Sequence, residues 1–180
     1  MKRGQMRIIA GRWRGRQIRT PAGVLVRPTA DRVREAWLSI VHLDLPDARV
    51  LDLYSGSGAL GLEALSRGAR HVDFVDSHPL PLRTLALNIE TLDAADRVTV
   101  YRDDVARFVG ALDAEQYDVA FADPPYLAGQ AVRLAEQWLT RPFARLLGVE
   151  HESSEKMPDG GSTRRYGATS ITFYRLPEPD

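Results

Sequence analysis

The chain has 180 residues, of which 44% are apolar, and this is enough for a single globular domain that buries most of its apolar surface. It contains no cysteine, which excludes disulfide bonds, a thiolate nucleophile and a cysteine–zinc site. No apolar run approaches the roughly 20 residues of a membrane span, and no apolar segment follows the basic N-terminus as a secretion signal requires. The histidines are scattered without the spacing of metal ligands, at His42, His71, His78 and His151. We therefore expect a cytoplasmic, monomeric protein with no metal and no membrane segment.

Basic side chains are concentrated at the N-terminus, although the net charge of the chain is zero. Residues 1–34 carry ten basic side chains and one acidic one, which leaves the remainder of the chain acidic. Nine of the ten are arginine, a side chain that binds phosphate through two N–H groups and stacks on bases. We expect residues 1–28 to form a basic hairpin arm that binds nucleic acid through Arg12, Trp13, Arg14, Arg16, Arg27 and the nearby Arg32. The alternatives are a solvated charged arm and an arm that pairs with the acidic body.

The segment after this arm predicts a helix near Thr29, whose apolar side chains should pack on the core at Val33, Trp37, Ile40 and Val41. The chain then alternates between strands and helices. We expect strands at 71–76, 98–102, 117–122 and 146–150, helices at 79–92 and 130–140, a polar loop at 151–163 and a hairpin strand at 170–174. Such alternation predicts an α/β fold with a doubly wound, mainly parallel sheet. The domain should span residues 29–176, and residues 177–180 should be a frayed tail.

A glycine turn follows the first buried strand, 50–53. It reads G-x-G-x-x-G from Gly56 to Gly61 and opens a helix that should end at Gly68, a pattern typical of nucleotide sites. The next strand ends in Asp76, 20 residues after Gly56. A carboxylate at that place can accept hydrogen bonds from both ribose hydroxyls of a nucleoside. The alternative makes Asp76 or Ser77 the N-cap of the helix that opens at Pro79.

Three strands end in an acidic residue, and ligands of such sheets bind outside the carboxyl ends of the strands. These residues are Asp76, Asp104 and Asp123. We expect a nucleoside to lie across the glycine turn, with its ribose on Asp76 and its adenine amino group near Asp104. The alternative for Asp104 is to cap the helix that starts at Val105.

The last of these acids opens the motif Asp123-Pro124-Pro125-Tyr126. The prolines restrict the backbone, the carboxylate and the Pro124 carbonyl are two acceptors, and the tyrosine ring is a flat face for a planar substrate. A planar NH₂ group has two N–H donors, so the motif matches the methylation of an exocyclic amino nitrogen. The alternative is an ordinary strand exit in which the prolines only end the ladder.

These features together resemble the S-adenosylmethionine-dependent amino methyltransferases. The motifs of residues 7–16, 27–35 and 56–68 resemble, in combination, the bacterial RsmD-type 16S ribosomal RNA (guanine966-N2)-methyltransferases, and the resemblance extends over about residues 6–175. It implies a Rossmann-like, seven-stranded methyltransferase sheet with a terminal antiparallel hairpin. It also implies S-adenosylmethionine as cofactor, and 16S ribosomal RNA or the assembling small ribosomal subunit as partner.

By position, the resemblance implies cofactor contacts at Asp52, Tyr54, Gly56, Gly58, Asp76 and Asp104. It implies a catalytic motif that consists of Asp123, Pro124, Pro125 and Tyr126. The absence of cysteine agrees with attack by an amino nitrogen, because methylation of a ring carbon usually needs a covalent thiolate adduct.

Other function classes compete with this interpretation. A nicotinamide-dependent oxidoreductase would share the glycine turn and Asp76 but would leave the Asp-Pro-Pro-Tyr motif without a role. A non-catalytic RNA-binding module would explain the arm alone. Within the methyltransferases, an adenine-N6 enzyme is the alternative, and glutamine-N5 enzymes with a similar motif carry asparagine in place of Asp123.

Overall fold

The structure is a computed structural model of the chain that describes residues 5–21, 28–126 and 129–178. Its helices are α1 (Pro28–Ile40), α2 (Ala59–Ser66), α3 (Pro79–Leu92), α4 (Val105–Gly110) and α5 (Gln130–Thr140), with a 3-10 turn at Ala95–Arg97. Its strands are β1 (Gln5–Arg7), β2 (Gln17–Arg19), β3 (Arg49–Leu53), β4 (His71–Asp76), β5 (Val98–Arg102), β6 (Tyr117–Ala122), β7 (Ala144–Glu152), β8 (Ser162–Tyr166) and β9 (Thr169–Arg175). The predicted RNA-binding residue Arg27 lies outside the described residues.

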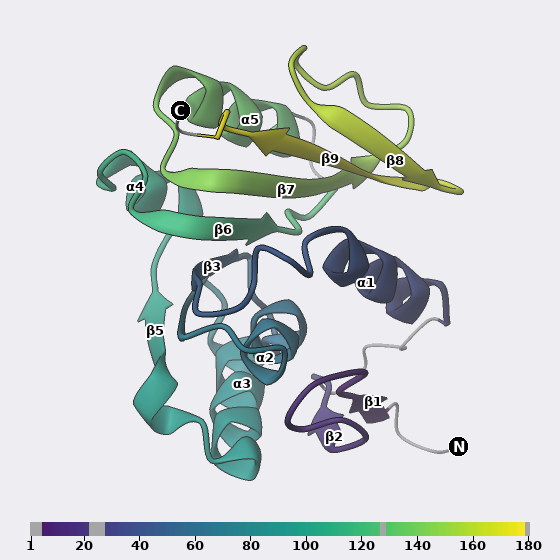
Figure 1. The fold of residues 1–180 in the computed structure, drawn as a ribbon, viewed down its shortest axis with the longest axis vertical. Coiled ribbons are helices and arrows are strands. Elements are labelled where there is room, and N and C mark those ends of the chain that lie inside the picture. Colours follow the sequence, from purple (N-terminus) through teal and green to yellow (C-terminus); the bar gives the residue numbers. More distant parts are fainter. Residues whose placement is uncertain (1–4, 22–27, 127–128, 179–180) are drawn as a thin grey trace.

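The described strands form two sheets (Figure 1). β1 and β2 make a small antiparallel hairpin, and the other seven strands form one sheet in the order β5-β4-β3-β6-β7-β9-β8. The first five of these are parallel, while β9 is antiparallel to both of its neighbours. The predicted α/β fold, with its seven-stranded sheet, its terminal antiparallel strand and its N-terminal hairpin, is therefore confirmed.

The helices cover both faces of the large sheet, which explains why the inner strands are apolar on both sides. α1, α2 and α3 pack with one set of strand side chains, and α4 and α5 pack with the other set. In β6, for example, Val119 and Phe121 face the first group of helices, whereas Ala120 and Ala122 face the second. None of the helices in the described ranges is long and apolar enough to cross a membrane.

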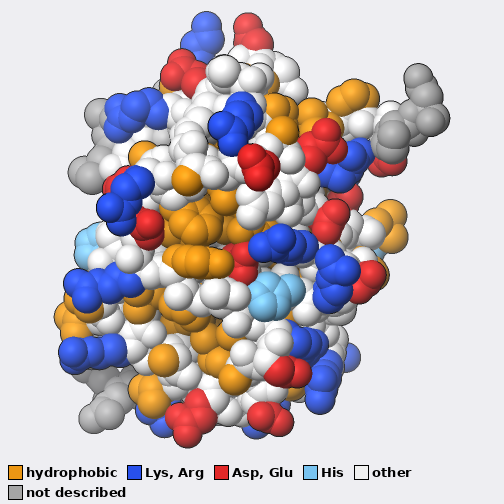
Figure 2. All heavy atoms as spheres, turned by 90° about the vertical axis from the view of Figure 1, so that its left-hand side faces the viewer, with side chains coloured by type: hydrophobic (Ala, Val, Ile, Leu, Met, Phe, Trp, Pro, Cys, Tyr) orange, Lys and Arg blue, Asp and Glu red, His pale blue; other side chains and the backbone are white. Residues whose placement is uncertain are grey.

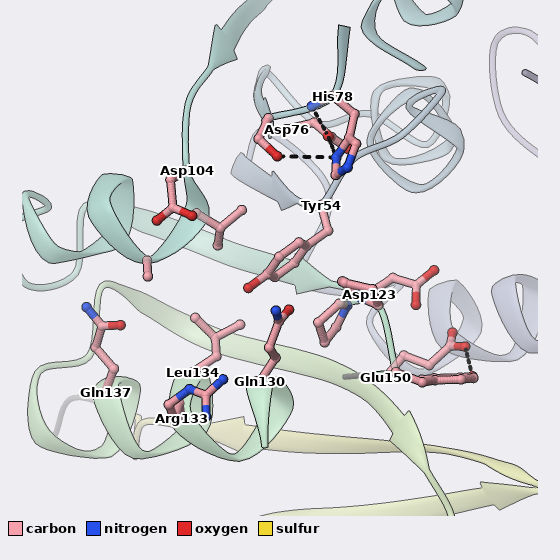
Figure 3. A pocket seen from close by; sticks show the side chains of 16 residues that line it. Tyr54, Asp76, His78, Asp104, Asp123, Gln130, Arg133, Leu134, Gln137 and Glu150 are labelled. Atoms are coloured by element: carbon pink, nitrogen blue, oxygen red, sulfur yellow. Dashed lines mark hydrogen bonds and ion pairs between the residues drawn. The ribbon is translucent and has the colours of Figure 1, made fainter. Parts of the chain in front are cut away.

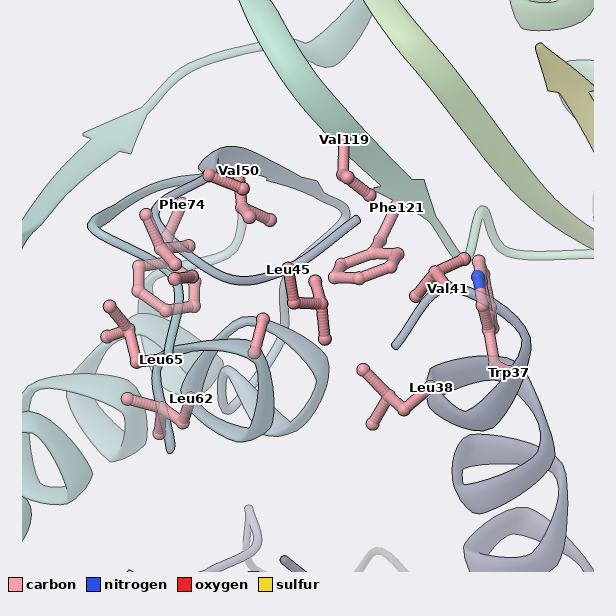
Figure 4. Packing of buried hydrophobic residues seen from close by; sticks show 14 of the residues in the cluster. Trp37, Leu38, Val41, Leu45, Val50, Leu62, Leu65, Phe74, Val119 and Phe121 are labelled. Carbon is pink, nitrogen blue, oxygen red and sulfur yellow. The ribbon is translucent and has the colours of Figure 1, made fainter. Parts of the chain in front are cut away.

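α1 lies over the centre of the sheet because Trp37 packs directly on it (Figure 4). The Trp37 ring meets Phe121 edge to face, with ring centroids 5.7 Å apart, and Phe173 at 6.4 Å. Gly148 makes room for it, since a Cβ there would lie 2.6 Å from the indole nitrogen. The prediction that Ile40 packs in the core is wrong, because its side chain is 40% exposed. Leu38 is buried in its place.

The N-terminal hairpin packs on the body of the domain instead of extending from it. Ile8, Trp13 and Ile18 are buried in the same cluster as the side chains of α2 and α3. The buried carboxylate of Glu63 accepts hydrogen bonds from the backbone N–H groups of Ile9 and Ala10, at 2.8 and 2.9 Å. The predicted arm of residues 1–28 is thus, over the residues described, a part of the folded core.

The structure corrects the prediction that Trp13 binds RNA. Its side chain is only 4% exposed, and the guanidinium groups of Arg97 and Arg12 lie over its ring at 5.1 and 5.9 Å. The indole therefore anchors the hairpin through burial and cation–π contacts and does not present a free face to a base. The sequence does not distinguish these two roles, because an aromatic residue among arginines is expected both in a buried anchor and in a surface that stacks on bases.

The C-terminal segment also differs from the prediction. β7 extends over Ala144–Glu152, two residues beyond the expected strand at each end, and β8 occupies part of the expected polar loop. β8 is an edge strand that pairs only with β9, and four of its five side chains are exposed. It therefore lacks the alternation of apolar and polar residues by which a strand is recognised.

Two glycines of the hairpin allow a matched test of its docking. Gly11 and Gly15 both have φ of +81°, but a Cβ on Gly11 would lie 1.8 Å from the Ser66 carbonyl oxygen, whereas a Cβ on Gly15 would meet nothing within 4 Å. We predict that Gly15→Ala costs about 1–2 kcal/mol of unfolding free energy, the penalty of a left-handed alanine. Gly11→Ala should cost a further 1–3 kcal/mol, roughly the scale of overpacking, because the clash is with backbone. Urea denaturation of both variants measures this, and equal losses would contradict the docked hairpin.

Candidate active site

The carboxyl ends of four parallel strands bring polar side chains to one edge of the sheet. In the strand register, Leu53 pairs with Val75 on one side and with Ala122 on the other, and Ala122 pairs with Val149. The residues one step further along these strands are Asp76, Tyr54, Asp123 and Glu150. Because side chains alternate between the faces of a sheet, the three acids point to the face covered by α1, α2 and α3.

A cleft of about 940 Å³ lies at this edge (Figure 3). Its lining brings together the predicted residues Tyr54, Asp76, Asp104 and Asp123 to Tyr126. It also contains side chains that we did not predict, which come from the start of α3, from α5 and from β7: Ser77, His78, Gln130, Arg133, Leu134, Gln137 and Glu150. The sequence predicts α5 only as a helix, since it carries no motif that points to the site.

The glycine turn approaches this edge with its backbone. Gly56 has φ of +54°, and a Cβ built on it would meet nothing within 4 Å, so its face is open to a ligand. Gly58 has φ of +81°, and a Cβ there would lie 2.3 Å from the Leu85 side chain. Tyr54 also has a positive φ, of 56°, which is uncommon for a residue with a Cβ and typical of functional sites.

Asp52 braces this turn from inside the protein. Its side chain is buried, and its Oδ2 accepts a hydrogen bond from the Gly61 N–H at 2.9 Å. Burial raises the pKa of Asp52 well above its ordinary value, and the negative charges of Asp123 and Asp76 raise it further. A cation placed beside Asp52 would reverse this effect and stabilise the carboxylate.

Asp76 holds the glycine turn to the start of α3. Its Oδ2 accepts from the Gly56 N–H at 2.9 Å and its Oδ1 accepts from the His78 N–H at 2.8 Å. The N-cap of α3 is His78, so the alternative interpretation of Asp76 or Ser77 as this cap is wrong. Oδ1 also lies 3.3 Å from His78 Nδ1, so Oδ2 is the oxygen with a lone pair left for a ligand hydroxyl.

Asp104 is confirmed as a helix cap. It is the N-cap residue of α4, and its side chain accepts from the Arg107 N–H at 2.9 Å. It also lines the cleft, on the side away from Asp123 (Figure 3). Capping and ligand contact are compatible, since the cap occupies only Oδ1.

Asp123 and Glu150 form a pair of carboxylates at the end of β6 and β7. Asp123 is reached by solvent through the cleft, but the cleft walls remove much of its hydration, and this together with the charge of Glu150 raises the pKa of Asp123 to about 7. Burial likewise raises the pKa of Glu150. The Tyr126 hydroxyl donates to Glu150 Oε1 at 2.9 Å and lies 3.0 Å from the Thr169 hydroxyl. Sequence reasoning missed Glu150 because only the strand register shows that it lies beside Asp123.

A second cavity, of about 550 Å³, lies on the α1 side of this pair. It shares Tyr54, Asp123, Tyr126 and Glu150 with the first cleft, so these side chains form the wall between the two. Its own lining includes the glycine turn, Asp52, Met6 of β1, and Arg34 and Trp37 of α1. Arg34 Nε and Ser55 Oγ are buried here and have no hydrogen-bond partner among the described residues.

The predicted RNA-binding arginines that the structure describes, Arg12, Arg14, Arg16 and Arg32, are exposed. None of them forms an ion pair with an acidic side chain in the described part of the chain. The side of the molecule that carries β5 and α4 looks different: acidic and basic side chains are interspersed around an apolar band (Figure 2). Across residues 5–21, 28–126 and 129–178, no cluster of three or more potential metal-ligating side chains is found.

Comparison with known proteins identifies the family. The family model described as "Conserved hypothetical protein 95" matches residues 6–175. The chain belongs to this family. The Ribosomal RNA small subunit methyltransferase D of Escherichia coli K12 is 37% identical over 181 residues, which cover 96% of this chain and 89% of that protein. The protein of the same name from Haemophilus influenzae is 34% identical over 183 residues, covering 97% and 94%.

Solved structures agree with this assignment. The protein yhhF of Escherichia coli has a TM-score of 0.81 at 33% identity, covering 95% of this chain and 97% of that chain. More distant methyltransferases share the fold alone, such as an RNA methyltransferase of Salinibacter ruber in complex with S-adenosyl-L-homocysteine, with a TM-score of 0.64, 16% identity and coverage of 87% and 96%. The family resemblance predicted from the sequence motifs is confirmed.

The carboxylate pair leads to a prediction that needs no assumption about the reaction. We predict that Glu150→Gln lowers the pKa of Asp123 below 7, because it removes the neighbouring negative charge, and that burial keeps this pKa above the ordinary value of an aspartate. Glu152→Gln is the control, since it removes an exposed charge from the same strand end. Carboxyl ¹³C NMR titration of labelled aspartates measures the pKa of Asp123 in both variants. If Asp123 titrated identically in Glu150→Gln and in wild type, the electrostatic coupling of Asp123 to Glu150 would be contradicted.

Proposed function

We propose that this protein transfers a methyl group from S-adenosylmethionine to the exocyclic N2 amino group of a guanine in small-subunit ribosomal RNA, guanine 966 in the numbering of that RNA. The observation that carries the proposal is the place of Asp123 and Tyr126, the two ends of the Asp-Pro-Pro-Tyr motif, on the wall between two cavities. The first cleft, together with the glycine turn that lines the second cavity, can hold a nucleoside cofactor, and the rest of the second cavity can hold the target. The acceptors of the motif lie where the two would meet.

The family supports the coarser part of this proposal. The relatives at 34–37% identity are named as methyltransferases of the small-subunit ribosomal RNA, and each is covered over most of its length. An adenine-N6 enzyme, the alternative, has a weaker counterpart: a tRNA1(Val) (adenine(37)-N6)-methyltransferase of Pectobacterium carotovorum is 32% identical over 120 residues, which cover only 62% of this chain. A nicotinamide-dependent oxidoreductase has no support from the family.

The residues at the strand ends fit S-adenosylmethionine. The open face of Gly56 allows close approach of the ligand, and the spare lone pair on Asp76 Oδ2 suits a ribose hydroxyl. Asp104 lies across the cleft from Asp123, where it would face the adenine. Asp52, with its raised pKa, is suited to a ligand that brings positive charge. When bound, the cofactor supplies an electrophilic methyl group on a sulfonium.

The protein's part in the reaction is to position and activate the amino nitrogen. The Asp123 carboxylate and the Pro124 carbonyl would accept the two N–H groups of the target and draw its lone pair out of conjugation with the ring. The Asp123 carboxylate makes no hydrogen bond within the described part of the chain, so it is free to do this. Its negative charge would stabilise the positive charge that develops on the nitrogen. The exposed ring of Tyr126 would stack on a base that has left its helix.

The exposed arginines of the hairpin support an RNA substrate, because they are not neutralised by acidic partners among the residues described. Arg16 is oriented by a hydrogen bond to the Thr91 carbonyl at 2.6 Å. A second basic element, which the sequence did not suggest, is β8, where Arg164 and Arg165 are exposed. The turn that joins β8 to β9 leads to Thr169, whose hydroxyl lies within 3.0 Å of Tyr126, so this element borders the site.

The catalytic role of Asp123 gives the first test of the function. We predict that Asp123→Ala lowers the rate of methyl transfer to small-subunit RNA by on the order of 100-fold or more, the scale of one lost charge-stabilising group. The affinity for S-adenosylhomocysteine, measured by calorimetry, should stay within a few-fold of wild type, since the nucleoside contacts lie elsewhere in the cleft. Turnover within a few-fold of wild type would show that the role assigned to Asp123 is wrong.

The hairpin gives the second test. Replacing Arg12, Arg14 and Arg16 together with alanine should weaken RNA binding and flatten its salt dependence by up to about three units of the log–log slope, since each phosphate contact contributes close to one. The control is the triple variant of Arg141, Arg145 and Arg175, surface arginines of which each pairs with an acidic side chain. Filter binding at several salt concentrations distinguishes the two triples. If both triples changed the slope equally, the hairpin would have no special part in binding RNA.

A further inference from the structure

Glu150 has no part in the proposed reaction, although it lies on the wall between the first cleft and the second cavity. We infer that the target guanine enters this second cavity and that Glu150 selects it by accepting the hydrogen bond of its N1–H group. This rests on the proposed function, and it adds the residue that distinguishes guanine from other bases carrying an exocyclic amino group. Asp123 would receive the N2 amino group and Glu150 the neighbouring ring N–H.

The chemistry of the bases makes two carboxylates selective. The Watson–Crick edge of guanine presents the N1–H donor directly beside the N2 amino donors, so it matches two neighbouring acceptors. Adenine presents an amino donor beside N1, which is an acceptor. An ionised carboxylate at that place would face a lone pair and remain unpaired, and a site with an unpaired buried polar group rejects the wrong substrate strongly.

The geometry places Glu150 next to Asp123 and orients it. The register of β6 and β7 puts the two residues side by side, one step beyond the Ala122–Val149 pair. The Tyr126 hydroxyl holds Oε1 at 2.9 Å, while Oε2 accepts no hydrogen bond from the described residues. The pair faces the second cavity as well as the first, and the two labelled side chains lie on the same side of the cleft in Figure 3. One Glu150 oxygen is therefore positioned and the other is free for a ligand.

The second cavity has further features that suit a base. Arg34 Nε and Ser55 Oγ are buried in its lining without partners among the described residues, so the cavity also offers donors for the acceptor atoms of a purine. The cavity borders Met6 of the hairpin and Thr169 at the start of β9. It thus opens between the two elements that carry exposed arginines, where an RNA strand would cross.

The test uses 2-aminopurine, a base that keeps the N2 amino group of guanine but has a bare N1. Small-subunit RNA that wild-type enzyme methylates is prepared with guanine or with 2-aminopurine at the target position, and single-turnover rates are compared. We expect wild type to prefer guanine by on the order of 10- to 100-fold, the scale of one base-edge contact. Glu150→Gln should reduce this preference to a few-fold, because the amide can also donate to N1. The control Glu152→Gln should keep the wild-type preference.

The result that overturns the inference is a Glu150→Gln enzyme with an unchanged guanine preference. Failure of the proposed function is recognised separately, because wild type would then not methylate the guanine RNA at all. The place of the base is tested by Met6→Trp, which fills the second cavity, against Gln17→Trp, an exposed residue on the partner strand of the hairpin. At saturating S-adenosylmethionine, Met6→Trp should lower RNA methylation by at least about 10-fold, and equal rates in the two variants would place the base elsewhere.

The pH dependence gives an independent readout. Protonation of the pair would let a carboxyl group donate to a bare N1, and burial raises the pKa of both Asp123 and Glu150. Lower pH should therefore reduce the guanine preference of wild type, and this dependence should be weaker in Glu150→Gln. A wild-type preference that did not change as Asp123 titrates would contradict the inference. The other ionisable side chains that line the two cavities are Asp52 and Tyr54 of β3 and its loop, Asp76 and His78, Asp104, Tyr126, Arg133 of α5, and Arg34 of α1.

Discussion

The site depends on the parallel register of four neighbouring strands, β4, β3, β6 and β7. Hydrogen bonding between the strands aligns their carboxyl ends. Because side chains alternate between the two faces of the sheet, Asp76, Asp123 and Glu150 point to the same face. Asp52 of β3 points to this face as well. A shift of any strand by one residue would move its acid to the other face, among the side chains of α4 and α5. The register is secured by apolar residues on both faces of every one of these strands. The core therefore positions the polar edge.

Bringing these acids together has an electrostatic cost. Burial raises the pKa values of Asp52, Asp123 and Glu150, and repulsion from neighbouring carboxylates raises those of Asp52 and Asp123 further, so the ionised forms are disfavoured in the free protein. A ligand with positive charge relieves this repulsion, and one without it does not. In S-adenosylmethionine the sulfonium carries such a charge, and methyl transfer removes it. The same cluster would thus favour the methyl donor over the neutral thioether product, which is consistent with the tendency of perturbed carboxylates to gather at functional sites.

Much of this could be predicted from the sequence, because strong local signals coincide with the final structure. The helices at 79–92 and 130–140 and the strands at 71–76, 98–102 and 117–122 have the predicted bounds, since each combines clear periodicity with Gly, Pro or Asp at its ends. The motif from Asp123 to Tyr126 and the glycine turn were visible for the same reason. Glu150 was not, because its importance comes from the neighbouring strand and not from its own neighbours in sequence. Trp13 was misread because burial is a tertiary property.

The basic hairpin and the glycine turn are also connected through one buried side chain, which no motif marks. Asn88 of α3 accepts from the Arg19 N–H at 2.7 Å, and its amide group donates to the Arg19 and Ser57 carbonyls at 3.0 Å each. It therefore joins β2 to the loop between Gly56 and Gly58. From the other end of the hairpin, Glu63 and Ser66 of α2 bind Ile9, Ala10 and Trp13. Because α2 starts at the glycine turn and α3 packs on it, the hairpin cannot move as a unit without breaking buried hydrogen bonds on both helices. The segment that carries the exposed arginines is thus held rigidly to the loop that approaches the cofactor.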